Sequence, residues 1–206
     1  MSFPDERYTD AGAYADAYFG FSAAAAAAVD RKSLEAAAAV LTKVHEEGGM
    51  VYSCGNGGSA AIANHLVCDH CKAVQSDTGL HPRIYSLSAT IEIITAVSND
   101  LSYDEVFVYQ LRSLAKPGDA LVAISSSGDS ENIVRAVTWA KEHGVPVIAM
   151  TGFSGGRAAT LADVNLHVPD DNYGVVEDVH QSLMHILAQY IRQAHMNATT
   201  IEQRTF

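Results

Sequence analysis

The chain has 206 residues, with 24 acidic and 13 basic side chains and a formal net charge of −11. This length suits one domain, and a content of 48% hydrophobic residues excludes an intrinsically disordered chain. The excess of acids excludes a general affinity for nucleic acid, and with no uncharged apolar run long enough to span a bilayer we expect no membrane partner.

The first ten residues, MSFPDERYTD, lack the basic and apolar regions of a secretory signal. The three cysteines are an odd number and too few for a disulfide framework: Cys54, Cys68 and Cys71. We therefore expect a cytoplasmic protein whose cysteines are thiols.

Two helices are predicted before the first strand. Six consecutive alanines favour a helix over Tyr14–Ala28. Apolar residues at helical spacing predict a second helix over Asp30–Glu46, ended by Gly48 and Gly49.

From Met50 onward, short apolar runs alternate with helical patterns. The predicted strands are Met50–Cys54, Arg83–Leu87, Ala120–Ser125, Val145–Thr151 and Val164–Val168. The predicted helices are Ala60–Val74, Ile91–Val97, Asp104–Leu114, Glu131–His143, Gly156–Ala162 and Val175–His195. This alternation predicts an α/β fold with a parallel sheet covered on both faces.

Two turns that follow predicted strands have unusual compositions. The glycine turn, residues 55–59, reads GNGGS, and its Ser59 is expected to cap the next helix. The serine turn, residues 125–130, reads SSSGDS. Either turn alone is also typical of an ordinary loop. Because doubly wound folds bind ligands where parallel strands end, the two turns together predict a site for a small phosphate.

Four longer segments contain these turns and the last predicted helix: CGNGGSAAIANH, VSNDLSYDEVF, KPGDALVAISSSGDSENIVRA and VEDVHQSLMHIL. In order and spacing they resemble the sugar isomerase (SIS) domain family, and within it the phosphoheptose isomerases. The resemblance implies a flavodoxin-like three-layer α-β-α sandwich with a five-stranded parallel sheet and N-terminal helices. It also implies an oligomerisation helix in residues 1–30, an SIS domain in 31–196, a tail in 197–206, and a homotetramer with active sites at subunit interfaces.

A metal site is suggested by spacing and by the resemblance. His65 and Asp69 are four residues apart and share one face of a predicted helix, an arrangement that is more often an ion pair or a capping contact than a metal site. The resemblance implies one Zn²⁺ per subunit, held at His65, Asp69, Glu177 and His185. Asp69 stands where the family has glutamate and Glu177 where it has glutamine, but both keep an oxygen donor.

The reaction implied by the resemblance is aldose–ketose isomerisation through an enediol, with sedoheptulose 7-phosphate as the first substrate and a D-glycero-D-manno-heptose 7-phosphate as product. Asp69 is the expected base and His185 the expected acid, with Glu177 as a second candidate for the base. The expected substrate-binding residues are Asn56, Gly57, Gly58, Ser59, Asn99, Asp100, Ser125, Ser126, Ser127 and Ser130.

Two alternatives stay open. The segment after the predicted metal helix lacks the arginine-rich stretch common in the heptose enzymes, so another ketose phosphate is a second candidate substrate. Some members of the family are non-catalytic phosphosugar sensors or scaffolds for a replication initiator. The four retained donors favour an enzyme over these.

Other histidines and cysteines in these helices have simpler expected roles. His180 lies about 140° from His185 around a helix, so we expect it beside a ligand residue or at an interface. His70 is expected at the surface or an interface, and Cys68 and Cys71 as small buried residues.

Overall fold

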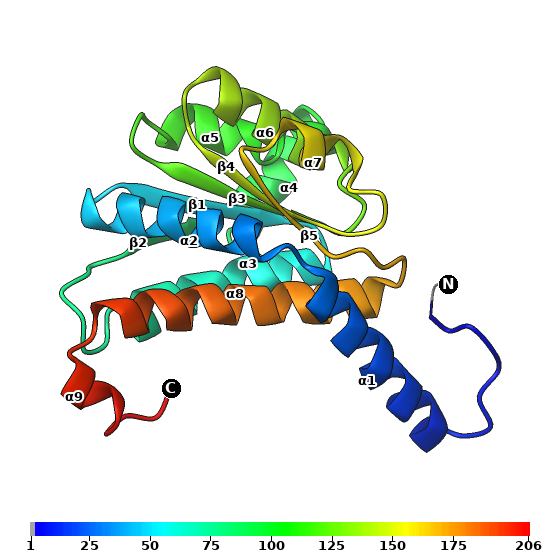
Figure 1. The fold of residues 1–206 in the computed structure, drawn as a ribbon. Coiled ribbons are helices and arrows are strands. Elements are labelled where there is room, and N and C mark those ends of the chain that lie inside the picture. Colours follow the sequence, from blue (N-terminus) through cyan, green and yellow to red (C-terminus); the bar gives the residue numbers. More distant parts are fainter. Residues whose placement is uncertain (1–2) are drawn as a thin grey trace.

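The computed structural model describes residues 3–206 and is built on a sheet of five parallel strands. The strands are β1 (Met50–Gly55), β2 (Arg83–Ser86), β3 (Ala120–Ser125), β4 (Val147–Thr151) and β5 (Val164–His167). They lie in the order β2-β1-β3-β4-β5 (Figure 1), which is the flavodoxin-like order.

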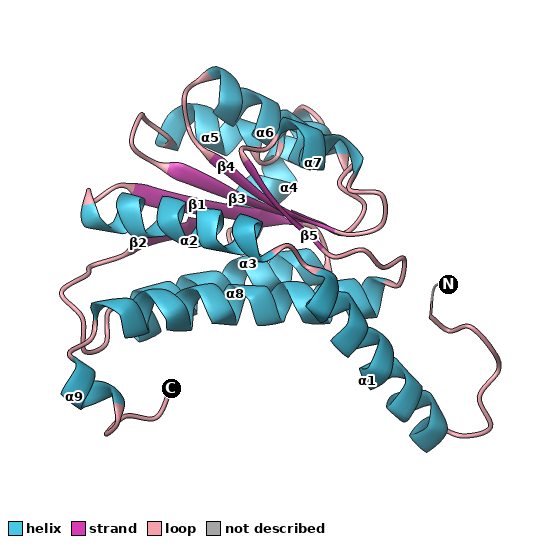
Figure 2. Ribbon diagram, viewed as in Figure 1, coloured by secondary structure: helices cyan, strands magenta, loops and turns pink. Residues whose placement is uncertain are grey.

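Helices cover both faces of this sheet (Figure 2). On one face lie α2 (Arg31–Glu46), α3 (Gly58–Cys68) and α8 (Tyr173–His195). On the other lie α4 (Ile91–Asp100), α5 (Val108–Leu114), α6 (Glu131–Glu142) and α7 (Gly156–Leu161). Because both faces are covered, every residue of β3 and β4 is buried, and the predicted three-layer sandwich is confirmed.

The helix α1 (Ala11–Ala28) extends away from the sandwich (Figure 1). It begins three residues before the predicted start, because the Asp10 side chain accepts a hydrogen bond from the Ala13 backbone N–H at 2.9 Å. Ala25 alone among its residues is buried, and Phe19 is 68% exposed. Most of this apolar helix is therefore left uncovered by its own chain.

The predicted helix over Ala60–Val74 differs from the structure. It starts at Gly58 and changes at Asp69 into a π-helix, η1 (Asp69–Val74). The wider turn places His70 in the core, where its Nδ1 lies 2.9 Å from Nε2 of His45. Burial lowers the pKa of His70 to about 3 and that of His45 to about 4. The expected surface position of His70 is wrong, and so is the expected burial of Cys68 and Cys71, which are exposed.

His180 also differs from expectation, because it is a core residue. Its Nε2 donates to the backbone carbonyl of Thr151 at 3.1 Å, and the side chain is fully buried. This bond joins α8 to the end of β4. The residue is therefore not exposed at the surface of this chain.

Two further elements were not predicted as such. The predicted helix over Asp104–Leu114 is divided into a short 3₁₀ turn, η2 (Tyr103–Glu105), and α5. The tail contains one helical turn, α9 (Ala198–Ile201), after which Arg204 pairs with Asp77 at 2.9 Å.

Over residues 3–206, none of the helices combines the length and the apolar character needed to cross a membrane.

Candidate functional site

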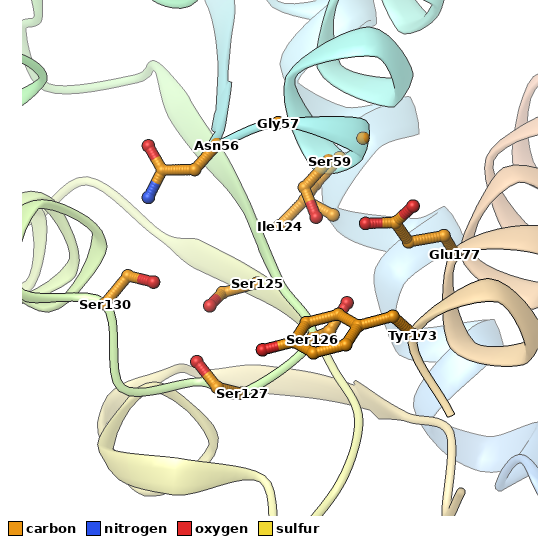
Figure 3. Close-up of a pocket in the computed structure, with 11 residues that line it drawn as sticks. Asn56, Gly57, Ser59, Ile124, Ser125, Ser126, Ser127, Ser130, Tyr173 and Glu177 are labelled. Atoms are coloured by element: carbon orange, nitrogen blue, oxygen red, sulfur yellow. The ribbon is translucent and has the colours of Figure 1, made fainter. Parts of the chain in front are cut away.

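A pocket lies where β1 and β3 end, at the carboxyl edge of the sheet. The two strands are neighbours, with Gly55 beside Ile124, so the glycine turn and the serine turn face each other. The cavity has a volume of about 260 Å³ and is shown in Figure 3. Its lining consists of Asn56, Gly57, Gly58, Ser59, Ile124, Ser125, Ser126, Ser127, Ser130, Tyr173 and Glu177.

The glycine turn is shaped by the start of α3. Gly57 has a φ of +55°, which glycine adopts without strain, and a β-carbon at Gly58 would overlap the carboxylate of Glu177. The helix begins at Gly58 with Gly57 as its N-cap, so the expectation that Ser59 is the cap is wrong. No side chain caps α3, and Gly57, Gly58 and Ser59 line the pocket, so the N-terminus of this helix lies at the pocket.

The serine turn places four hydroxyls around the same volume (Figure 3). Ser125 Oγ accepts from the Gly128 N–H at 3.1 Å and Ser127 Oγ from the Asp129 N–H at 3.3 Å. Ser126 Oγ is buried and has no partner among the described residues. Ser130 is the N-cap of α6, yet its side chain makes no capping bond. The pocket therefore joins hydroxyl donors to two helix N-termini, which is the chemistry of an oxyanion site.

The serine turn is held in place by α7. Arg157 donates to Asp129 Oδ1 from its backbone N–H at 3.0 Å and from Nε at 2.9 Å, and these bonds lower the pKa of the Asp129 carboxyl. Gly128 has a φ of +67°, and a β-carbon there would overlap the carbonyl of Gly155. The turn thus depends on a close backbone approach.

We expect Gly128→Ala to lower the free energy of unfolding by about 1–3 kcal/mol, because it combines a left-handed backbone with a steric overlap. Urea titration of the variant measures this change. Gly79→Ala is the matched control, since a β-carbon at Gly79 meets nothing within 4 Å. Equal stability of the two variants would contradict the packing of this turn.

Asn56 is fixed by side chains from two other elements. It exchanges two hydrogen bonds of 2.9 Å with Asn132 of α6 and accepts one of 2.8 Å from the Tyr103 hydroxyl. Sequence reasoning singled out Asn56 and missed both partners. They lie 47 and 76 residues away along the chain, so no local pattern indicates them.

Glu177 enters the pocket from the second turn of α8 (Figure 3). Burial, with the charge of Asp178 as the smaller cause, raises the pKa of its carboxyl. Tyr173, the first residue of α8, also lines the pocket and was missed because the helix was predicted to start at Val175. Its ring packs edge-on against Phe153, with centroids 4.8 Å apart.

The expected metal ligands divide into two groups. His65 Nε2 lies 3.2 Å from Asp69 Oδ1, and His185 Nδ1 lies 2.6 Å from Asp69 Oδ2. One donor atom from each of these three residues lies within 4.8 Å of the others. Two imidazole nitrogens and one carboxylate oxygen fit a zinc ion that keeps a position open for substrate. We call these three residues the His-Asp-His cluster.

Glu177 does not join this cluster within the chain. It precedes His185 by eight residues, which is about 12 Å along the axis of α8. Its carboxylate lies instead against Gly58 at the start of α3.

Asn99 and Asp100 lie outside the pocket. They are exposed at the end of α4, where the Asn99 amide donates to Asp100 Oδ1 at 2.8 Å. Neither residue is among those that line the pocket between the two turns.

Comparisons with known proteins match the chain over most of its length. The family model for the SIS domain matches residues 17–152. A phosphoheptose isomerase of Mycobacterium bovis is 40% identical over 171 residues, covering 80% of this chain and 85% of that protein. A phosphoheptose isomerase of Colwellia psychrerythraea is 38% identical over 162 residues, covering 77% of this chain and 82% of that protein. A solved phosphoheptose isomerase from Neisseria gonorrhoeae has a TM-score of 0.80 and 33% identity, covering 87% of this chain and 97% of that chain.

Proposed function

Because the chain belongs to the SIS domain family and is an isomerase of phosphorylated sugars, we propose that it converts sedoheptulose 7-phosphate to a D-glycero-D-manno-heptose 7-phosphate. The observation that carries the proposal is the pocket between the glycine and serine turns. There, four hydroxyls and two uncapped helix N-termini surround a volume that also receives a carboxylate.

The phosphate of the substrate occupies the serine turn. Ser126 has a buried hydroxyl without a partner among the described residues, and the hydroxyls of Ser125, Ser127 and Ser130 line the same wall. Neutral donors and helix dipoles bind a phosphate without a lysine. This suits a chain whose overall charge would repel larger polyanions.

Isomerisation needs a base that removes a proton from C1 of the ketose and an acid that protonates C2 of the enediol. A second proton moves from the oxygen on C1 to the oxygen on C2. Asp69 and His185 form a carboxylate–imidazole pair at 2.6 Å, which can exchange a proton in both directions. Glu177 is the second candidate for the base, because it lines the pocket itself and its raised pKa makes it a stronger base than an exposed carboxylate.

The proposal includes one zinc ion per subunit at the His-Asp-His cluster. When bound, such an ion would polarise the sugar carbonyl and stabilise the negative charge that develops on its oxygen. His65, Asp69 and His185 would hold it. Glu177 remains a fourth candidate ligand only if an assembly brings it to the cluster of another subunit.

A homotetramer with shared sites is the proposed assembly. The His65 and His185 side chains are 46% and 38% exposed, so the cluster can be reached from outside the chain. Asn99 and Asp100 are exposed as well. A neighbouring subunit could therefore bring its pocket residues to this cluster, since Glu177 and His185 of one chain lie about 12 Å apart along the axis of α8. The proposed cytoplasmic location is supported by the three free thiols.

The activity is tested with ketose phosphates of five to seven carbons. We expect the highest kcat/KM with the heptulose 7-phosphate, and at least tenfold weaker binding in the Ser125→Ala/Ser127→Ala variant, because each lost bond to a charged group costs about 1.5–3 kcal/mol. Titration calorimetry measures the affinity. Higher turnover of a pentulose or hexulose phosphate would reassign the substrate, and unchanged affinity of the variant would reject the phosphate site.

The assembly is tested through α1. Removing residues 1–30 should lower the molecular mass measured by light scattering, because the apolar surface of α1 would no longer join subunits. If the surface that α1 covers becomes exposed instead, the truncated protein should aggregate. Phe19→Asp is the sharper variant, since this exposed side chain contributes little to the chain's own core. Asp16→Asn, at an exposed position of the same helix, is the control. A monomer at micromolar concentration in the unaltered protein would refute the tetramer.

A further inference from the structure

Gln181 lies beside the His-Asp-His cluster, although neither the spacing nor the expected ligand set includes it. It precedes His185 by one helical turn on the same face of α8. Its amide nitrogen lies 2.9 Å from His185 Nε2 and 3.4 Å from His65 Nδ1. One amide therefore reaches both imidazoles.

Asp69 and Gln181 contact opposite nitrogens of the two rings. Asp69 faces His65 Nε2 and His185 Nδ1, whereas Gln181 faces the other nitrogen of each ring. The two rings stand edge to face, with centroids 5.0 Å apart. The four side chains thus form a closed ring of polar contacts.

This ring assigns a tautomer to each histidine in the metal-free protein. A carboxylate only accepts hydrogen bonds, so the nitrogens that face Asp69 carry the protons. In a neutral imidazole the opposite nitrogen is then a bare acceptor. The Gln181 amide group has two N–H donors, one for each of these acceptors.

A bound metal ion would reverse which nitrogen of each imidazole ring carries the proton. An ion held at Asp69 needs the lone pairs of His65 Nε2 and His185 Nδ1, so each ring must give up that proton and take one from solvent on its outer nitrogen. No net proton is gained or lost by either ring. The outer nitrogens become donors, and they need an acceptor.

We propose that Gln181 is a positioning residue whose side-chain amide flips between the metal-free and the metal-bound protein. Its NH₂ group donates to the two histidines without metal, and its carbonyl oxygen accepts from them with metal. Glutamine suits this role because the two ends of its amide have nearly the same shape. Outer contacts of this kind orient metal-binding imidazoles and set their affinity. The proposal rests on the metal site of the proposed function.

The test measures Zn²⁺ affinity by competition with a chromogenic chelator. We expect Gln181→Leu to bind zinc about 10- to 100-fold more weakly, because it can neither donate nor accept. Gln181→Glu should stay within a few fold of the unaltered protein, because its carboxylate accepts from the outer nitrogens. Gln189→Leu, at an exposed position two turns further along α8, is the matched control and should leave the affinity unchanged. Unaltered affinity in Gln181→Leu would overturn the proposal.

A second measurement separates this proposal from the metal site itself. Nitrogen NMR of the metal-free protein should find His185 protonated on Nδ1 and His65 on Nε2, with the outer nitrogens bare. In Gln181→Glu the outer nitrogens should carry protons as well, because both nitrogens of each ring then face a carboxylate. Protonation on the outer nitrogens in the unaltered protein would overturn the assigned role of Gln181. If the protein has no measurable zinc affinity, the metal part of the proposed function fails, and the NMR result still decides the role of Gln181. Should Gln181→Leu not fold, Gln181→Glu and the NMR spectra provide the test.

Discussion

Replacing His185 with alanine is expected to remove both the bound metal and the isomerase activity. The His-Asp-His cluster has only three donors within one chain, so the variant keeps His65 and Asp69 as a two-donor site. The same change removes the imidazole that lies 2.6 Å from Asp69 and would exchange protons with it. Loss of a polarising ion costs several kcal/mol of transition-state stabilisation, which corresponds to a decrease in kcat of about 10³-fold or more.

Elemental analysis of protein purified without chelators measures the metal, and a heptulose phosphate assay measures kcat. His65→Ala should behave in the same way, since it removes another of the three donors. His81→Ala is the control, because His81 is exposed and lies outside the cluster. Full activity of the unaltered protein without metal would defeat the zinc site and leave an enediol mechanism that uses the side chains alone.

Neutralising the base is the second change with a large expected effect. Asp69→Asn and Glu177→Gln each keep the shape of the side chain and remove its negative charge. The variant that lacks the true base should lose about 10²- to 10⁴-fold in kcat, the usual contribution of general base catalysis. We expect the larger loss in Asp69→Asn, because the Asp69 carboxylate contacts both histidines.

Measurement of metal content distinguishes the two roles proposed for Asp69. If Asp69→Asn loses activity and keeps zinc, Asp69 acts as the base; if it loses both, it acts as a ligand, and Glu177→Gln then decides the base. Asp171→Asn, at an exposed position outside the pocket and the cluster, serves as the control. Full kcat in both Asp69→Asn and Glu177→Gln would reject the carboxylate base.

The two parts of the site are the reason for proposing that subunits share their active sites. The pocket proposed to bind phosphate lies at the carboxyl edge of the sheet, and the His-Asp-His cluster lies further along α3 and α8. On α8, Glu177 of the pocket and His185 of the cluster are eight residues apart, which is about 12 Å along the helix axis. Two observations support the proposal that subunits share their sites: the histidines of the cluster are partly exposed, and most of α1 is left uncovered.

The amino-acid sequence by itself determined the sheet and the place of the pocket between the glycine and serine turns. The strand predicted over Ala120–Ser125 has those bounds in the structure, because a run buried on both faces is apolar throughout and ends at polar residues. The glycine and serine turns could be assigned to one edge because parallel strands all end on the same side.

Only the tertiary structure decided which polar side chains meet. The spacing of His65 and Asp69 predicted a shared helix face; that Asp69 also meets His185, 116 residues further along the chain, was implied by the family resemblance alone and not by any local pattern. The π-helix turned His70 into the core, and helical rise kept Glu177 away from His185. Local periodicity specifies which face of a helix a residue occupies, whereas its partner depends on how separate helices pack together. For this reason Tyr173, Asn132 and Gln181 became part of the site only in the folded chain.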